Sequence, residues 1–333
     1  MIDRRSVAAG AAALAVAGCA GQGAIQVNVL PNDPAGAPDP VAGLATGRDV
    51  SQRVTAPVRI NGQGPFEFVL DTGANRTVIC AELAARLGLP DGGQATVHGV
   101  AGAEPAATAI IGLFEADSVV ARGLRAPAIP RERLGADGLL GVDVLHDRRV
   151  LIDLVNHRLT ISGDRSIAPD LTSFDLRTAQ TGVAADLGRR FVVPARYRFG
   201  QLIIIGADIA GRSVTAFVDS GSQSTVGNNA LRRLIDQGDP ADPQAARYIS
   251  PIYSATGQTA QGELRPMPLL RIGGLYIRGL NTVFADLHVF EIWDLLNRPS
   301  LLLGMDILSR FNAIELNYGR REVAFYLPAR ARR

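Results

Sequence analysis

The chain has 333 residues, a formal net charge of +2 and 47% hydrophobic residues, which fits a globular protein with a substantial core and no nucleic-acid partner. All 34 basic residues are arginine, so mechanisms that need a P-loop lysine, a Schiff-base lysine or a Ser-Lys dyad are excluded. Its four histidines lack His-Glu-x-x-His spacing and it has only two cysteines, so we expect no metal site and no cofactor.

The first residues have the pattern of a bacterial export signal. Arg4 and Arg5 precede a short apolar run that cannot span a bilayer, so residues 1–18 are interpreted as a signal peptide. Val-Ala-Gly-Cys at residues 16–19 resembles a lipobox, and the alternative is an ordinary signal peptide with a cysteine near its cleavage point. We therefore expect a periplasmic lipoprotein, anchored to a bacterial membrane through Cys19.

A segment rich in glycine, alanine and proline follows. Residues 19–47 have no helical period, and they are interpreted as a flexible tether, with a pro-segment as the less favoured alternative. If Cys19 is acylated, Cys80 has no disulfide partner in the chain and is expected to be a small apolar residue at the start of a helix.

Strand patterns dominate the next part, which we interpret as an N-terminal lobe over residues 48–162. Apolar and polar residues alternate up to Leu70, which predicts a half-buried strand. A helix stop signal after this strand predicts that a short helix ends there. The predicted order is strands from residue 54, a helix over 81–89, a glycine-rich hairpin tip over 98–103, strands over 110–120 and 124–129, and a strand pair over 150–161.

The same order returns after a polar connection over residues 163–190, and it predicts a C-terminal lobe over residues 191–328. The predicted elements are strands over 192–209 and 214–218, a helix over 228–234, a second glycine-bearing hairpin tip over 253–258 and a strand pair over 313–327. Because both halves lie in one chain, we expect a monomer to be sufficient for function.

Each half contains an Asp-Thr/Ser-Gly triplet at the end of an apolar run. The triplets are Asp71-Thr72-Gly73 and Asp219-Ser220-Gly221, 148 residues apart, and Thr-Val follows each glycine at the same spacing. A lone triplet is ordinary turn chemistry, whereas two in matching contexts predict a duplicated half-site. Two adjacent carboxylates cannot both ionise cheaply, so one keeps a proton while the other activates water.

With these motifs the chain resembles the aspartic proteases of the pepsin and retropepsin type. In that family a hydrophobic-hydrophobic-Gly element passes behind each triplet, and the matching residues here are Leu139, Leu140, Gly141, Leu302, Leu303 and Gly304. The resemblance covers Val54 to Leu327. It implies an all-β fold of two pseudo-symmetric β-barrel lobes with a few short helices, and an active site in the cleft between them.

The resemblance also assigns roles within the two triplets. Asp71 and Asp219 would be the catalytic dyad. The hydroxyls of Thr72 and Ser220 would lock the two loops together, and Gly73 and Gly221 would let backbone N–H groups face the carboxylates.

Other residues near these motifs are expected to have supporting or structural roles. Gly102 and Gly257, in the two hairpin tips, are flap candidates, with ordinary hairpin turns as the alternative. Asp143 and Asp306 are expected to begin helices. Three further residues are expected to be structural: Asp153, Glu315 and Trp293.

Together these observations predict an aspartic endopeptidase that hydrolyses extended peptide or protein substrates without a metal ion or covalent intermediate. One alternative is a peptide-binding or scaffolding lipoprotein on the same fold with little or no activity. A glycoside hydrolase with two carboxylates is disfavoured, because the repeated triplet context does not belong to that chemistry.

Overall fold

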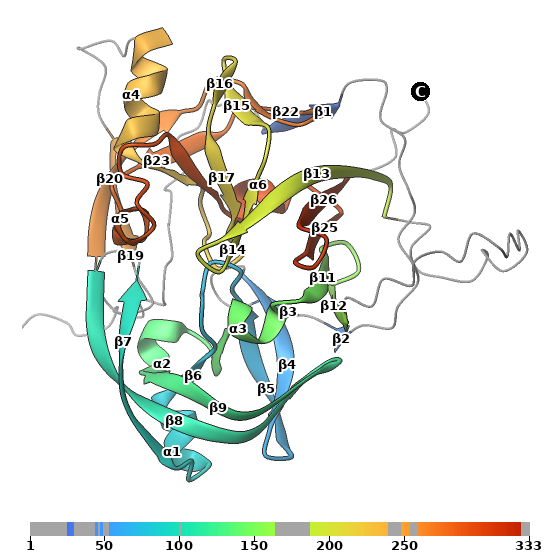
Figure 1. Ribbon diagram of the computed structural model, residues 1–333, viewed down its shortest axis with the longest axis vertical. Coiled ribbons are helices and arrows are strands. Elements are labelled where there is room, and N and C mark those ends of the chain that lie inside the picture. Colours follow the sequence, from blue (N-terminus) through green and yellow to red (C-terminus); the bar gives the residue numbers. More distant parts are fainter. Residues whose placement is uncertain are drawn as a thin grey trace, which may run out of the picture.

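The computed structural model describes residues 25–29, 44–45, 47–48, 53–99, 102–163, 187–238, 248–253 and 259–327. The fold is all-β, with two lobes that lie one above the other and are joined by a shared sheet (Figure 1). The predicted signal peptide, the lipidation candidate Cys19 and the flap candidate Gly257 lie outside the described residues.

The N-terminal lobe is a closed barrel. Its strands are β4 (Val54–Ile60), β5 (Gln63–Leu70), β6 (Val78–Cys80), β7 (Asp91–Gly99), β8 (Gly102–Ala116), β9 (Val119–Ile129) and β10 (Gly138–Leu140), with helices α1 (Ala81–Arg86), α2 (Arg131–Leu134) and α3 (Val142–Leu145). The strand order is β4-β5-β10-β6-β9-β8, and a second pairing of β4 with β8 closes the barrel. Phe68 and Phe114 fill its interior, with ring centroids 5.8 Å apart.

The C-terminal lobe repeats this connectivity with its long strands broken. Its strands are β13 (Arg189–Arg198), β14 (Gln201–Ile204), β15 (Ala207–Ile209), β16 (Arg212–Ser213), β17 (Thr215–Val218), β18 (Val226–Gly227), β19 (Tyr248–Tyr253), β20 (Thr259–Pro266), β21 (Leu270–Ile272), β22 (Leu275–Arg278), β23 (Asn281–Phe284) and β24 (Ser300–Leu303). Its helices are α4 (Asn229–Gly238), α5 (His288–Ile292) and α6 (Met305–Leu308).

Matching strand pairs show the repeat directly. In the N-terminal lobe β10 runs parallel to β5 and antiparallel to β6, and in the C-terminal lobe β24 runs parallel to β17 and antiparallel to β18. The long strands β8 and β9 correspond to the pairs β20/β21 and β22/β23. The C-terminal lobe is therefore divided between two sheets, and β15, β16, β21 and β22 belong to a separate one.

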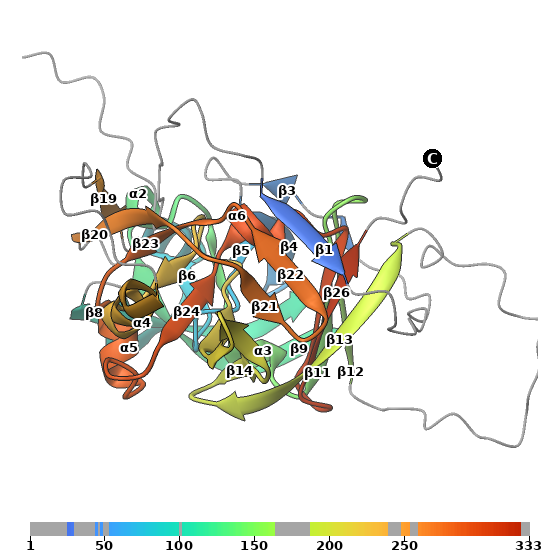
Figure 2. The ribbon, with the colours of Figure 1, turned by 90° about the horizontal axis from the view of Figure 1, so that it is seen from above.

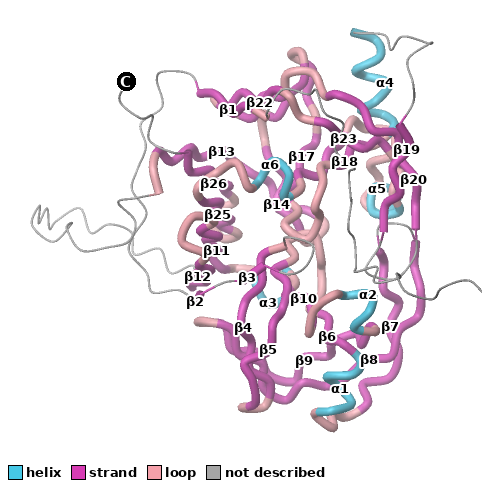
Figure 3. The backbone as a smooth tube through the Cα atoms, turned by 180° about the vertical axis from the view of Figure 1, so that it is seen from behind, coloured by secondary structure: helices cyan, strands magenta, loops and turns pink. Residues whose placement is uncertain are grey.

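A shared sheet joins the lobes. Its strands are β11 (Arg148–Asp153) and β12 (Arg158–Gly163) from the first half, β25 (Ala313–Asn317) and β26 (Glu322–Leu327) from the second, β13, and β2 (Leu44–Ala45) at its edge. Strand β11 pairs antiparallel with β25, so the two strand pairs predicted from the sequence lie side by side (Figure 3).

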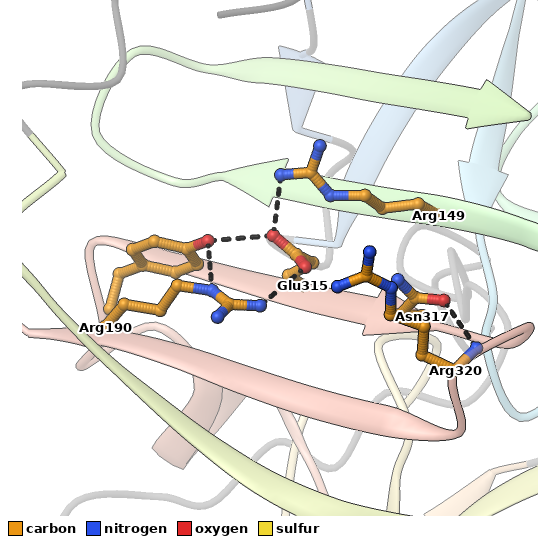
Figure 4. Close-up of polar contacts among 6 residues, drawn as sticks. Arg149, Arg190, Glu315, Asn317 and Arg320 are labelled. Atoms are coloured by element: carbon orange, nitrogen blue, oxygen red, sulfur yellow. Dashed lines mark hydrogen bonds and ion pairs between the residues drawn. The ribbon is translucent and has the colours of Figure 1, made fainter. Parts of the chain in front are cut away.

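Glu315 lies in this shared sheet and is only 2% exposed. It accepts hydrogen bonds from Arg149 (2.9 Å), Arg190 (3.0 Å) and the hydroxyl of Tyr326 (2.8 Å), as Figure 4 shows. Burial raises the pKa of Glu315, but the hydrogen bond and charge of Arg149, together with the charge of Arg190, hold it below its usual range. The carboxylate therefore ties β25 to three other strands, which is a structural role.

One part of the predicted tether is ordered. Gln26–Val29 form strand β1, which pairs antiparallel with β22 at a sheet edge (Figure 2). For this stretch the interpretation of residues 19–47 as a flexible tether is wrong, because β22 offers free backbone partners and Ile25 and Val27 pack against the core. Strand β3 (Gly47–Arg48) also pairs antiparallel, with β4.

Among the described helices, none has the length and apolarity needed to cross a bilayer.

Candidate active site

Asp71 and Asp219 occupy equivalent positions at the ends of β5 and β17. The backbone N–H of Asp71 donates to the carbonyl of Leu140 (3.1 Å), and that of Asp219 donates to the carbonyl of Leu303 (3.0 Å). Each aspartate is thus held from behind by a Leu-Leu-Gly element, where strands β10 and β24 run parallel to the strands that carry the triplets.

The two hydroxyl residues of the triplets connect the lobes. Thr72 Oγ1 donates to the carbonyl of Val218 (2.9 Å), and Ser220 Oγ donates to the carbonyl of Leu70 (2.8 Å). In addition, the N–H of Ser220 donates to Thr72 Oγ1 (3.0 Å) and the N–H of Thr72 donates to Ser220 Oγ (3.2 Å). Since all four groups are buried, this reciprocal set fixes one triplet against the other.

Each carboxylate is held by backbone N–H groups of its own loop. Asp71 Oδ1 accepts from Gly73 (2.9 Å) and Ala74 (3.0 Å). Asp219 Oδ1 accepts in the same way from Gly221 (3.0 Å) and from the next residue (3.2 Å). These bonds leave the other oxygen of each carboxylate for water or substrate.

The triplet glycines bring the two aspartates together. A Cβ atom on Gly73 would lie 2.7 Å from Asp219 Oδ1, and one on Gly221 would lie 2.3 Å from Asp71 Cγ. Each glycine therefore packs directly against the aspartate of the opposite lobe, at a position where the Cβ atom of any other residue would clash.

The environment of the dyad favours one retained proton. Burial, and then the negative charge of Asp71, raise the pKa of Asp219 to about 7. Burial also raises the pKa of Asp71, while the positive charge of Arg53 and the N–H groups of Gly73 and Ala74 oppose that rise. Because Asp219 is only 9% exposed and Asp71 is half-buried, Asp219 is the better holder of the proton.

Arg53 was not identified from the sequence. Its side chain is 1% exposed, and it donates to the carbonyl of Leu134 (2.7 Å). It lies well before the first triplet in the chain, so no local motif connects it with the dyad.

A second layer behind the dyad is also duplicated. The hydroxyl of Thr77 donates to Asp143 Oδ1 (2.7 Å) and accepts from the N–H of Gly141 (3.2 Å). In the other lobe the hydroxyl of Thr225 donates to Asp306 Oδ1 (2.7 Å) and accepts from the N–H of the matching glycine, Gly304 (3.2 Å).

These bonds define what the two later aspartates do. Asp143 and Asp306 lie in the first turns of α3 and α6, where a helix-start role was expected. Their carboxylates are turned towards the threonines, so they brace the loops that carry the dyad. The repeated Thr-Val after each triplet was the sequence signal for this layer.

A cavity of about 320 Å³, which we call the interlobe cavity, lies in front of the dyad. Both lobes line it, and its lining includes Asp71, Asp219, Arg76, Ile129, Ile252 and Val289. Trp293 also borders the cavity, but it is buried and packs against Phe217 with ring centroids 4.8 Å apart. No group of three metal-ligating side chains is present in the described part of the chain.

The β7–β8 hairpin reaches across to the C-terminal lobe (Figure 3). Residues 96–99 of β7 line the interlobe cavity. His98 Nδ1 of β7 lies 3.0 Å from His288 Nε2 of α5, and the two rings stack with centroids 5.3 Å apart. His288 Nδ1 in turn lies 3.2 Å from Glu291 Oε2. Sequence reasoning missed this histidine pair, because the two residues are 190 positions apart.

The flap candidates are described only in part. Gly102 begins β8, next to the hairpin end that carries His98, so it belongs to the segment beside the cavity. The tip residues 100–101 and Gly257 lie outside the described residues.

No curated protein matches the chain. Residues 56–144 match the family model described as aspartyl protease. The matched span contains the first triplet and the element Leu139–Gly141, and the match supports the aspartic protease type. The similarity to the aspartyl protease family thus lies within the N-terminal lobe.

Proposed function

We propose that the protein is an aspartic endopeptidase that hydrolyses peptide bonds in extended peptides or proteins. The observation that carries the proposal is the pair Asp71 and Asp219, each held by equivalent hydrogen bonds and each packed against the glycine of the other lobe. Two carboxylates held at fixed positions next to each other can orient one water between them.

In the proposed reaction Asp71 is ionised and Asp219 is protonated. Asp71 takes a proton from the bound water while the water oxygen attacks the scissile carbonyl carbon, and Asp219 gives its proton to the carbonyl oxygen. Asp71 then gives the proton that it took from water to the amide nitrogen, and Asp219 recovers its proton from a hydroxyl of the gem-diol as the C–N bond breaks, which releases an amine and a carboxylic acid. The raised pKa of Asp219 supports this assignment of acid and base.

The test is cleavage of an unbiased peptide library across pH 4 to 8 by the chain carrying Cys19→Ser, so that no lipid is attached. Asp71→Asn and Asp219→Asn are each expected to lower cleavage by roughly 10³-fold, since each removes an acid or base from the reaction. Asp147→Asn, at a side chain that is 86% exposed, is the control and should cleave like the parent. Full activity in either dyad variant would refute the shared-water mechanism.

A peptide-binding or scaffolding role is the alternative. The contact of His98 on β7 with His288 on α5 supports it, because a contact that joins the two lobes beside the cavity restricts the entry of a substrate. Peptide binding without cleavage by the parent protein at any tested pH would favour this role.

We also propose that the protein is an exported, periplasmic lipoprotein that works as a monomer. The support is the sequence at residues 1–19, together with the presence of both half-sites in one chain. Metabolic labelling with a fatty acid tests the anchor: Cys19→Ser should abolish the label and release the protein from the membrane fraction. Retained label would place the lipid elsewhere.

A further inference from the structure

The two lobes present different side chains to the interlobe cavity from one equivalent backbone position. Arg76 lies five residues after Asp71, and Ser224 lies five residues after Asp219. Both backbones are supported in the same way, because a Cβ atom on Gly141 would lie 2.4 Å from the carbonyl carbon of Arg76, and one on Gly304 would lie 2.4 Å from that of Ser224.

The side chains at this position differ in character and exposure. Arg76 is exposed and lines the interlobe cavity. Ser224 is 7% exposed, and its carbonyl accepts a hydrogen bond from the hydroxyl of Ser222 (2.8 Å). The backbone is therefore supported in the same way in both lobes, but only the N-terminal lobe places a cation at this position beside the cavity.

The charge of Arg76 is not used within the described structure. Among the described residues no carboxylate forms an ion pair or hydrogen bond with Arg76. The nearby cation that favours the charged forms of both dyad carboxyls is Arg53. Of the lining residues in the described part of the chain, Arg76 is the one permanent cation.

The wall contributed by the C-terminal lobe is apolar. Strand β19 contributes Ile252, and α5 and the residue after it contribute Val289, Ile292 and Trp293. An extended peptide places successive side chains on opposite faces, so it can meet an apolar wall with one side chain and Arg76 with another.

We propose that Arg76 selects peptides with a glutamate or aspartate close to the scissile bond, while an apolar side chain packs against Ile252 and α5. The guanidinium fork matches a carboxylate in a geometry that a neutral or cationic side chain cannot satisfy. The assignment of this peptide as a substrate rests on the proposed function, but its recognition can be measured without cleavage.

The experiment measures peptide binding to protein that carries Asp219→Asn, so that bound peptide is not consumed. The probes are peptides of about eight residues, long enough to extend through the cavity. They have apolar central residues and differ only in having Glu, Gln or Lys at one scanned position. Each is titrated calorimetrically against Asp219→Asn alone and combined with Arg76→Gln, Arg76→Glu or Arg278→Gln.

Without a change at Arg76, the Glu peptide should bind about fivefold more tightly than the Gln peptide at one scanned position, and the Lys peptide least tightly. Arg76→Gln should abolish this preference, and Arg76→Glu should reverse it in favour of Lys. Arg278→Gln is the matched control, since Arg278 is exposed on β22 and does not line the cavity; it should leave the preference unchanged.

The outcomes separate this inference from the proposed function. An equal Glu-to-Lys ratio with and without Arg76→Glu overturns the role of Arg76, even if the parent protein cleaves peptides. A reversed ratio in a protein whose parent cleaves nothing supports the recognition and refutes the protease. If none of the peptides binds any variant, the cavity is not a peptide site and both ideas fall.

Discussion

Thr77 and Thr225 donate to Asp143 and Asp306 at the same distance of 2.7 Å, whereas their preceding residues, Arg76 and Ser224, share neither charge nor exposure. The bonds behind the dyad are thus repeated almost atom for atom in the two lobes, and the surfaces in front of it are not. Under the proposed function, the two lobes therefore share one supporting frame but present different surfaces to a peptide.

The barrels differ in a similar way. In the N-terminal lobe the uninterrupted strands β8 and β9 help to close a single barrel. In the C-terminal lobe the corresponding stretch of chain is interrupted and forms β20 to β23. Strands β21 and β22 of this stretch belong to another sheet, which also contains β1. The strands next to the dyad keep their pairings in both lobes, so the variation is confined to regions farther from the dyad.

Among the variants that test this comparison of the lobes, the largest effect is expected from alanine at the two triplet glycines. The new Cβ atom would approach Asp71 to 2.3 Å in Gly221→Ala and Asp219 to 2.7 Å in Gly73→Ala. Because displaced catalytic groups lose roughly 10²-fold or more in rate, both variants should be nearly inactive, with Gly221→Ala the worse. Steady-state cleavage measures the loss, and circular dichroism checks the fold.

Gly238→Ala provides the control, since nothing lies within 4 Å of its added Cβ atom. It should retain parental activity. If Gly221→Ala cleaves as fast as this control, the close packing of the glycine against the opposite aspartate is not needed for catalysis.

The second-largest effect is expected on the free energy of unfolding, and it should differ between variants of Asp71 and Asp219. The folded pKa of Asp219, about 7, is above its ordinary value of 3.8, so the unfolded carboxyl loses its proton at lower pH than the folded one. The contribution of Asp219 to stability must therefore fall as pH rises from about 4 to about 7. Asp219→Asn cannot ionise, and it should be more stable than the parent at pH 7.5 by on the order of 2 kcal/mol.

Urea unfolding at pH 4 and pH 7.5 measures this gain, which should be present only at the higher pH. Asp71→Asn should gain less, because Asp71 is more exposed and the charge of Arg53 favours its ionised form. Equal gains at both pH values would show that packing, rather than ionisation, is responsible.

The smallest effect is expected at the contact between the lobes beside the cavity. His288→Phe keeps a ring that can stack on His98 but removes the hydrogen bond, so the end of β7 should open more often. Loss of one hydrogen bond of ordinary strength corresponds to about a two- to tenfold rise in amide exchange, measured across residues 94–99 by mass spectrometry.

His157→Asn, in the turn between β11 and β12, is the control for that measurement. It should leave exchange in β7 unchanged. Unaltered exchange in His288→Phe would mean that the histidine pair does not hold the hairpin closed.

Much of the fold and of the frame behind the dyad could be predicted from the sequence, because their signals are local and occur twice. The alternation in β5, the paired triplets and the two Leu-Leu-Gly elements each specify backbone geometry within a few residues. The all-β prediction is confirmed. Cys80 also has the predicted place, buried at the start of α1, where its sulfur accepts from the N–H of Leu83.

The missed features depend on contacts between distant segments. Arg53 reaches the dyad region, and His98 meets His288, only after the barrel has closed and the lobes have docked. Strand β1 forms because β22 is an available sheet edge, which four residues of polar and apolar alternation could not reveal.

The central claim is that Asp71 and Asp219 form one titrating unit that holds a proton near neutral pH. It is tested most directly by NMR titration of ¹³C-labelled aspartate carboxyls, with Asp219 assigned from the Asp219→Asn variant. We predict that Asp219 titrates at about 7 and that Asp71→Asn lowers its pKa, because the repelling charge is removed. A pKa of Asp219 near 3.8, or one unaffected by Asp71→Asn, would contradict the account.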